Sequence, residues 1–300
     1  MYKLLLIDNE VDYCKALKNA ASLEDIHIEF YHNFQDGLEV IDENFEKFQG
    51  VIFDARCFKN NIQESNKEET DDAIYGSLSQ FEDLLRRKND YIPYCVNTGF
   101  SSTFQTSIEG MGVKVFQKNN ESRDQMFQFF KDQIDNLPDI QIEKKYPEVF
   151  DVFNNGYIDI ALKKNLIKAI REIENGHINI DLFNPLRKIL EAILLEANRL
   201  DSNWLPDEMI KSNGEPNLEW SYRYMSGLET NTPSEHYQEG HNKSFPNHIS
   251  RIVQSFKEIT NQNSHYDKNR MTQYTLMHVT YGLMDVLIWF KNYIDENNLK

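Results

Sequence analysis

Residues 3–10, KLLLIDNE, form a short apolar run that ends in polar side chains. A nearly continuous apolar run of this length is typical of a β-strand buried on both faces. Similar runs at residues 50–53 and 92–96 also end in polar groups, Asp54 and the NTG triplet 97–99. We therefore predict buried strands whose carboxyl ends carry polar side chains.

Segments with helical spacing alternate with these strands along the first 136 residues. Strands that alternate with helices need parallel crossovers, which favours an open α/β sheet. In such sheets the chemistry gathers at the carboxyl ends of the strands. The strands are expected at residues 3–7, 26–31, 50–53, 92–96 and 112–116, and the helices at residues 11–23, 34–45, 77–87 and 124–134.

Three segments of the chain depart from this alternation of strands and helices. Residues 58–73 are long, polar and acidic, and we interpret them as a surface insertion after the third strand. Residues 137–147 contain two prolines and mixed charge, which indicates a linker between domains. Beyond it the strand pattern stops, so residues 148–300 are predicted to be an all-helical domain. Its helices are expected at residues 158–173, 185–200, 249–259 and 271–294, with an irregular excursion at 205–239.

Composition narrows the class of protein. The 300 residues are 40% hydrophobic, enough for real cores, and carry a net charge of -16. Residues 1–136 hold 14 Lys+Arg against 25 Asp+Glu, and the remainder holds 18 against 23. Because both parts are acidic, we expect no binding to generic duplex DNA. The apolar runs are too short to cross a membrane and no leader pattern opens the chain, so we expect a cytoplasmic protein.

Polar residues at the strand ends suggest phosphoryl chemistry. Asp8 and Asn9 follow the first strand, Asp54 the third, Thr98 the fourth and Lys118 the fifth. Carboxylate and amide oxygens suit a hard divalent ion such as Mg²⁺. A carboxylate beside that ion can attack a phosphoryl donor, while a hydroxyl and an ammonium stabilise the transferred group.

Four motifs in this order, LLLIDNE, VIFDAR, VNTGF and VFQK, resemble the receiver domain of two-component response regulators. The resemblance covers residues 1 to about 136 and implies a doubly wound sheet of order 2-1-3-4-5. It also implies a partner histidine kinase, or another phosphodonor, and a requirement for Mg²⁺. The family most often has a second acid where Asn9 stands.

The resemblance assigns roles to individual residues. It implies that Asp54 is the phosphoacceptor and that Thr98 and Lys118 sense the phosphoryl group. It implies a metal site made of Asp8, Asn9, Asp54 and the backbone carbonyl of Arg56.

The second half is similar, more loosely, to the HEPN superfamily of helical bundles. The likeness rests on LRKILEAILLEANRL at residues 186–200 and ITNQNSH at 259–265, and covers about residues 148–297. Many such domains are RNases with an Arg followed, after four to six residues, by a His. Here seven residues separate Arg270 from His278, and seven separate Lys257 from His265. We therefore expect a non-catalytic bundle that binds a protein partner, with a homodimer as a further option.

The sequence thus predicts a response-regulator-like signalling protein with no enzymatic activity beyond the receiver's own phosphorylation and dephosphorylation. Two alternatives stay open. One is an RNase or defence effector of the HEPN type that is gated by the receiver. The other is an adaptor with a degenerate receiver that is not phosphorylated.

Overall fold

The computed structural model describes residues 1–66, 73–99, 102–177, 179–241, 243–263 and 272–299. The chain divides into two compact units, Met1–Ile140 (unit 1) and Gln141–Lys300 (unit 2). The division falls inside the stretch that we expected to be a linker. Among the described helices, none has the length and apolar character needed to cross a membrane.

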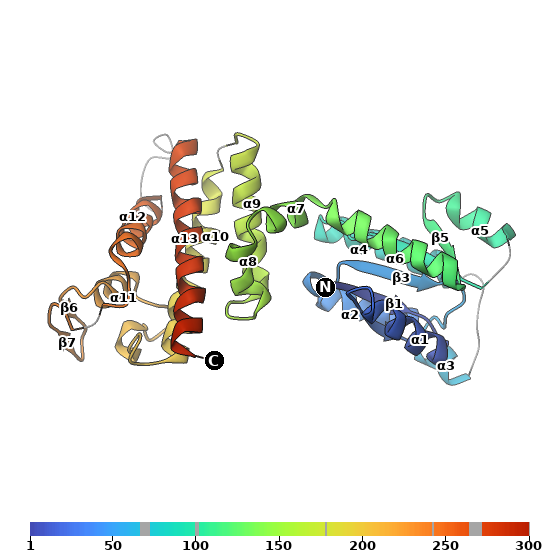
Figure 1. Ribbon diagram of the computed structural model, residues 1–300, viewed down its shortest axis with the longest axis horizontal. Helices are drawn as coiled ribbons and strands as arrows, with labels where there is room; N and C mark the ends of the chain where they lie inside the picture. The colour runs from blue at the N-terminus through green and yellow to red at the C-terminus, as the bar shows by residue number, and fades with distance from the viewer. Residues whose placement is uncertain (67–72, 100–101, 178, 242, 264–271, 300) are drawn as a thin grey trace. The chain divides into compact units, whose positions relative to one another are not determined.

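Unit 1 contains a five-stranded parallel sheet of order β2-β1-β3-β4-β5 (Figure 1). This confirms the predicted doubly wound α/β sheet. The strand order reverses between β1 and β3, which is where such sheets form a crevice at their carboxyl edge. The strands are β1 (Tyr2–Ile7), β2 (Ile26–Tyr31), β3 (Gly50–Asp54), β4 (Tyr94–Thr98) and β5 (Lys114–Gln117).

Helices cover both faces of this sheet. Helices α1 and α6 pack on the face formed by Leu6, Ile52 and Cys95. Helices α2, α4 and α5 pack on the opposite face, formed by Ile7, Phe53 and their neighbours. The helices are α1 (Val11–Ser22), α2 (Phe34–Glu43), η1 (Phe45–Lys47), α3 (Asn61–Asn66), α4 (Ala73–Lys88), α5 (Ser102–Glu109) and α6 (Asn120–Asp135).

Two of these helices lie where none was predicted. Helix α5 follows β4, and α3 lies within the insertion that we expected to be a surface loop. The described residues 58–66 of the insertion therefore include a short helix. Residues 67–72 lie outside the described residues, and Ala73 begins α4.

The described part of unit 2 is mainly helical, as predicted, and also contains a two-residue antiparallel pair, β6 (Thr230–Asn231) with β7 (His236–Tyr237). Pro138 and Pro147, which suggested a linker, are the first residues of α7 and α8. Proline suits this position because the first helical N–H has no partner in the helix anyway. The helices are α7 (Pro138–Lys145), α8 (Pro147–Asn154), η2 (Ile160–Leu162), α9 (Lys163–Glu174), η3 (Ile180–Leu182), α10 (Phe183–Leu200), η4 (Asp207–Met209), α11 (Leu218–Met225), α12 (Asn247–Asn263) and α13 (Gln273–Asn297).

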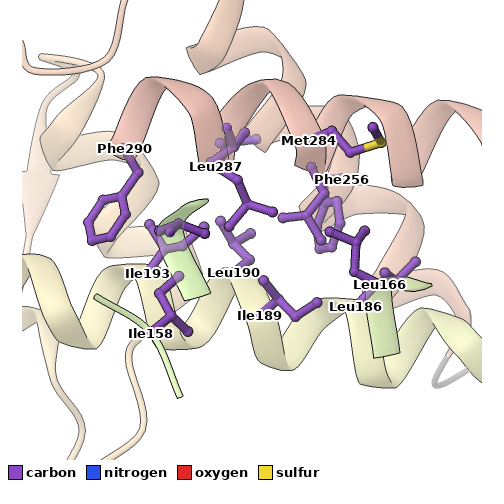
Figure 2. Close-up of a cluster of buried hydrophobic side chains, with 14 of the residues drawn as sticks. Ile158, Leu166, Leu186, Ile189, Leu190, Ile193, Phe256, Met284, Leu287 and Phe290 are labelled. Atoms are coloured by element: carbon purple, nitrogen blue, oxygen red, sulfur yellow. The ribbon is translucent and has the colours of Figure 1, made fainter. Parts of the chain in front are cut away.

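Helix α13 is the centre of unit 2, since α8, α9, α10 and α12 all contact it (Figure 1). Its buried face meets the apolar face of α10, where Leu190 and Ile193 lie beside Leu287 (Figure 2). In this core, Leu186, Leu190, Ile193 and Leu287 are buried, and Ile288 is partly buried against them.

Candidate functional site

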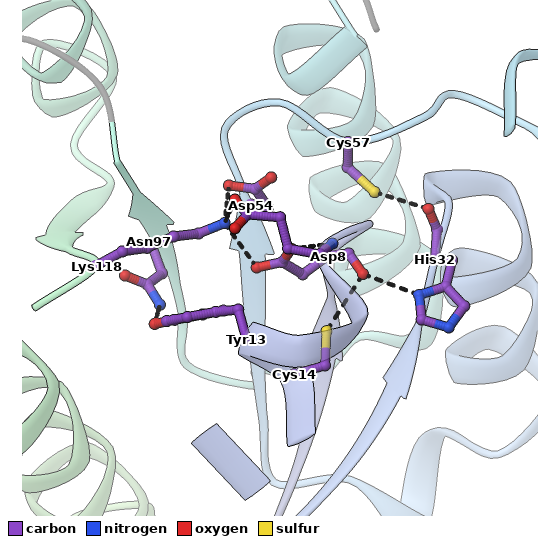
Figure 3. Close-up of polar contacts among 9 residues, drawn as sticks. Asp8, Tyr13, Cys14, His32, Asp54, Cys57, Asn97 and Lys118 are labelled. Atoms are coloured by element: carbon purple, nitrogen blue, oxygen red, sulfur yellow. Dashed lines mark hydrogen bonds and ion pairs between the residues drawn. The ribbon is translucent and has the colours of Figure 1, made fainter. Parts of the chain in front are cut away.

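The carboxyl edge of the sheet brings together polar residues from four strands. Asp8 directly follows β1, Asp54 ends β3, Asn97 lies near the end of β4, and Lys118 directly follows β5. Their side chains converge although the residues are far apart in sequence (Figure 3). Parallel strands produce this convergence, because all their carboxyl ends lie at the same edge.

The register of the sheet decides which face each residue occupies. Asp54 pairs with Asn97, one residue before Thr98. Neighbouring side chains along a strand point to opposite faces, so Asn97 shares the face of Asp54. Thr98 is fully buried, and strand alternation assigns its side chain to the opposite face, that of α4 and α5. Its backbone carbonyl accepts a hydrogen bond from the Lys118 N–H at 2.9 Å.

Lys118 is the cation at the centre of the site. Its Nζ lies 3.0 Å from Asp8 Oδ2, 3.1 Å from Asp54 Oδ1 and 2.7 Å from Glu10 Oε1. The Lys118 side chain is 8% exposed, and those of Asp8 and Asp54 are 0% and 2% exposed. Only the contact with Glu10 has the geometry of a hydrogen bond; the other two are ion pairs. One ammonium therefore faces three carboxylates.

This surplus of negative charge changes the acidity of the buried groups. Burial, and then the charge of Asp8, raises the pKa of Asp54 to about 7. Burial also raises the pKa of Asp8, and the attraction of Lys118 offsets this only in part. Burial opposes the charge of Lys118, but Asp54 and Asp8 outweigh it, so the pKa of Lys118 is raised. The site stabilises a cation more than it stabilises its own carboxylates.

The carboxylates form an arrangement that suits a divalent cation. One oxygen from each of Asp8, Glu10 and Asp54 lies within 4.8 Å of the other two. Asp8 Oδ2 and Asp54 Oδ1 are buried and have no hydrogen-bond partner among the described residues. Oxygen donors of this kind are the ligands that Mg²⁺ prefers. The donor set therefore fits the predicted Mg²⁺, with Glu10 as a member that the sequence analysis missed.

Glu10 is brought to the site by a turn. Asp8 Oδ1 accepts a hydrogen bond from the Glu10 N–H at 2.9 Å, so the chain folds back directly after β1. Acids two residues apart after a strand were visible in the sequence, and this spacing was the available signal. Asn9 lies between them, and Arg56 follows β3 by two residues. The roles of Asn9 and of the Arg56 carbonyl as ligands stay predictions.

Tyr13 is a second residue that sequence reasoning missed. Its hydroxyl accepts a hydrogen bond from Asn97 Nδ2, and its ring centroid lies 4.7 Å from Lys118 Nζ (Figure 3). Burial raises the pKa of Tyr13 to about 12, so the phenol is neutral at physiological pH. Tyr13 thus links α1 to β4, and its ring face makes a cation–π contact with the Lys118 ammonium.

A layer of side chains holds the backbone of Asp8. Cys14 Sγ donates to the Asp8 carbonyl at 3.4 Å, and His32 Nδ1 lies 3.2 Å from the same oxygen. Cys57 Sγ donates to the His32 carbonyl at 3.1 Å (Figure 3). Burial raises the pKa of both thiols, so they act as neutral donors. Together with Cys95, they are free and buried.

Of the four basic residues singled out in the second half, Lys257 and His278 lie in the described part of the chain, and each contacts a neighbouring side chain. Lys257 pairs with Glu219 and lies over the Tyr222 ring, 4.8 Å from its centroid. His278 Nε2 lies 2.8 Å from Ser255 Oγ on the neighbouring helix. Arg270 and His265 lie outside the described residues.

Comparison with known proteins adds little to this geometry. No family model and no curated protein matches the chain. Among the solved structures that match is a response regulator receiver domain protein from Clostridium thermocellum, with a TM-score of 0.32 and 15% sequence identity. The match covers 45% of this chain and 95% of that one.

Proposed function

We propose that unit 1 accepts a phosphoryl group on Asp54 in the presence of Mg²⁺, and that this modification alters how unit 2 binds a protein partner. The observation that carries the proposal is the position of Asp54. Its carboxylate is buried at the crevice of the sheet, 3.1 Å from the Lys118 ammonium and within reach of two further carboxylates.

The chemistry follows from these groups. A carboxylate oxygen of Asp54 attacks phosphorus, the bond from phosphorus to the donor breaks, and the donor leaves with its electron pair. The product is an aspartyl phosphate, a mixed anhydride. Lys118 is held close enough to pair with an oxygen of the transferred group. Mg²⁺ held by Asp8, Glu10 and Asp54 would neutralise negative charge on these carboxylates and on the phosphoryl oxygens.

The donor and the output are parts of the same proposal. The donor is a phosphohistidine of a histidine kinase or a small acyl phosphate, as the resemblance of the strand-end motifs implies. The partner of unit 2 is a protein, because residues 137–300 hold 23 acidic against 18 basic side chains and generic duplex DNA needs an excess of positive charge.

The test is phosphorylation of the full-length protein by acetyl phosphate with and without Mg²⁺, followed by mass spectrometry of the intact chain. We expect one phosphate adduct that requires Mg²⁺, appears in Asp83→Asn, and is absent from Asp54→Asn. Asp83 is a matched control because it is an exposed aspartate of the same unit. An unmodified wild type, or an adduct that persists in Asp54→Asn, would refute the proposal and favour a non-phosphorylated adaptor.

A further inference from the structure

Unit 2 carries a groove that the proposed phosphoryl chemistry does not use. It has a volume of about 520 Å³ and lies between one face of α13 and the segment around Ser244 and Pro246 that leads into α12. On α13 its lining follows residues 285, 288, 289, 292, 293 and 296. Each of these positions has another one three or four residues away, which is the spacing of neighbours on one helix face, so they form one continuous stripe along the helix.

The centre of the groove is aromatic and rigid. Trp289 and Tyr293 line it and are only partly buried. The Trp204 ring stacks on Tyr293, with ring centroids 4.3 Å apart and an interplanar angle of 18°. Phe245 meets Trp289 edge to face, with centroids 4.9 Å apart. These contacts hold both rings in place. A ligand that stacks on them therefore binds with little entropic cost for ordering the two side chains.

The ends of the stripe are negative. Asp285 and Glu296 are exposed, and neither forms an ion pair with another described residue. The described lining contains no Lys or Arg, and its one basic side chain is the imidazole of His248 at the start of α12. Glu296 follows Asp285 by eleven positions, which corresponds to roughly 16 Å along a helix and nearly the same angular position. Each carboxylate thus flanks the aromatic centre from one end.

The opposite wall supplies an unsatisfied polar atom. Ser244 Oγ is buried and has no hydrogen-bond partner among the described residues. Because this oxygen is itself buried, it lies below the surface of the groove and is not a contact for a ligand that rests on the aromatic rings. The accessible lining therefore combines aromatic faces and negative ends.

We infer that this groove binds an extended, arginine-bearing segment of a protein partner. A guanidinium group stacks on aromatic faces and pairs with carboxylates, and so matches both features. In an extended segment, two arginines five residues apart are separated by roughly 16 Å, the spacing of the two carboxylates. The inference rests on the protein-binding half of the proposed function and names the chemistry of the partner.

The test is calorimetric titration of the full-length protein, without a phosphodonor, with the capped peptide Arg-Ser-Gly-Ser-Gly-Arg at low ionic strength. We expect Asp285→Asn/Glu296→Gln to weaken binding about tenfold, because each removed charge loses a guanidinium partner. The control Glu148→Gln/Asp181→Asn removes two exposed charges elsewhere on unit 2 and is expected to bind like the wild type. A citrulline peptide, neutral but of the same shape, is expected not to bind.

Three results would overturn the inference. The first is equal binding by the groove variant and the wild type, or no binding by either. The second is equal affinity for arginine amide alone, which would indicate a small-cation site. The third is a concentration-dependent dimer in sedimentation that the groove variant abolishes, which would assign the groove to a second copy of the chain. Because no phosphodonor is present, each of these results leaves the role of Asp54 unaffected.

Discussion

At the level of single residues, Asp54 couples the stability of unit 1 to pH. Burial and the charge of Asp8 raise its pKa in the folded protein to about 7, from an ordinary value of 3.8. Between these two values the native state keeps a proton that the unfolded chain has released. The free energy of unfolding therefore falls as pH rises from about 4 to about 7 and stays low above that range.

We predict that Asp54→Asn stabilises the metal-free protein above pH 7 and flattens this pH dependence. The pKa of Asp54 stays raised although the attraction of Lys118 lowers it, and one pKa unit corresponds to about 1.4 kcal/mol. We therefore expect a gain of about 2 to 4 kcal/mol, measured by urea unfolding at several pH values. Asp83→Asn is the control, since its carboxylate is exposed. An unchanged pH profile in Asp54→Asn would contradict the prediction.

Glu10 provides a second prediction at this scale, because its carboxylate lies within 4.8 Å of those of Asp8 and Asp54. We expect Glu10→Gln to weaken Mg²⁺ binding about tenfold, or about 1.4 kcal/mol, as an anionic oxygen donor is replaced by a neutral one. Titration calorimetry with MgCl₂ measures this. Glu43→Gln, an exposed acid at the end of α2, is expected to bind Mg²⁺ like the wild type. Equal affinities in the two variants would remove Glu10 from the metal site.

At the scale of elements, Asn33 joins the start of α2 to the insertion after β3. It is fully buried, and its Oδ1 accepts the Asp36 N–H at 2.9 Å as the N-cap of α2. Its Nδ2 lies 3.0 Å from Asn61 Oδ1 and 2.8 Å from Glu64 Oε2, both on α3. One side chain thus caps one helix and anchors another.

We predict that Asn33→Ala lowers the free energy of unfolding of unit 1 by about 2 kcal/mol. The loss of a cap costs about 1 kcal/mol, and the loss of the hydrogen bonds from the buried amide to the exposed Asn61 and the half-buried Glu64 adds a similar amount. Asn44→Ala is the matched control, because Asn44 is exposed at the other end of α2. Denaturant unfolding compares the two, and an equal effect of both changes would show that Asn33 does not anchor α3.

At the scale of the whole molecule, two separate cores predict two unfolding transitions. The apolar clusters on the two faces of the sheet belong to unit 1, and one continuous cluster fills unit 2. We expect calorimetry of the full-length protein to resolve two unfolding transitions. Mg²⁺ is expected to raise the midpoint temperature of the transition that belongs to unit 1. Calorimetry of the isolated fragments 1–140 and 141–300 shows which transition belongs to which unit. A single transition, or an equal shift of both by Mg²⁺, would contradict this prediction.

Long periodic segments and buried apolar runs were enough to predict the five strands and most long helices. The missed helices α3, α5, α7, α8 and α11 have eight residues or fewer. Two helical turns offer too few apolar positions to establish a period, and such helices depend on tertiary packing for stability. Prolines at the starts of α7 and α8 also resemble linker signals when read without their context.

The sequence by itself determined that Asp8, Asp54 and Lys118 meet, because each ends or follows a parallel strand and such ends share one edge. Only the tertiary structure decided that Asn97 lies on the face of Asp54, that Tyr13 supports Lys118, and that Glu10 joins the carboxylates. A shift of one residue in strand register exchanges the two faces of a sheet. Register and helix packing depend on the fit of whole cores, and no local motif encodes them.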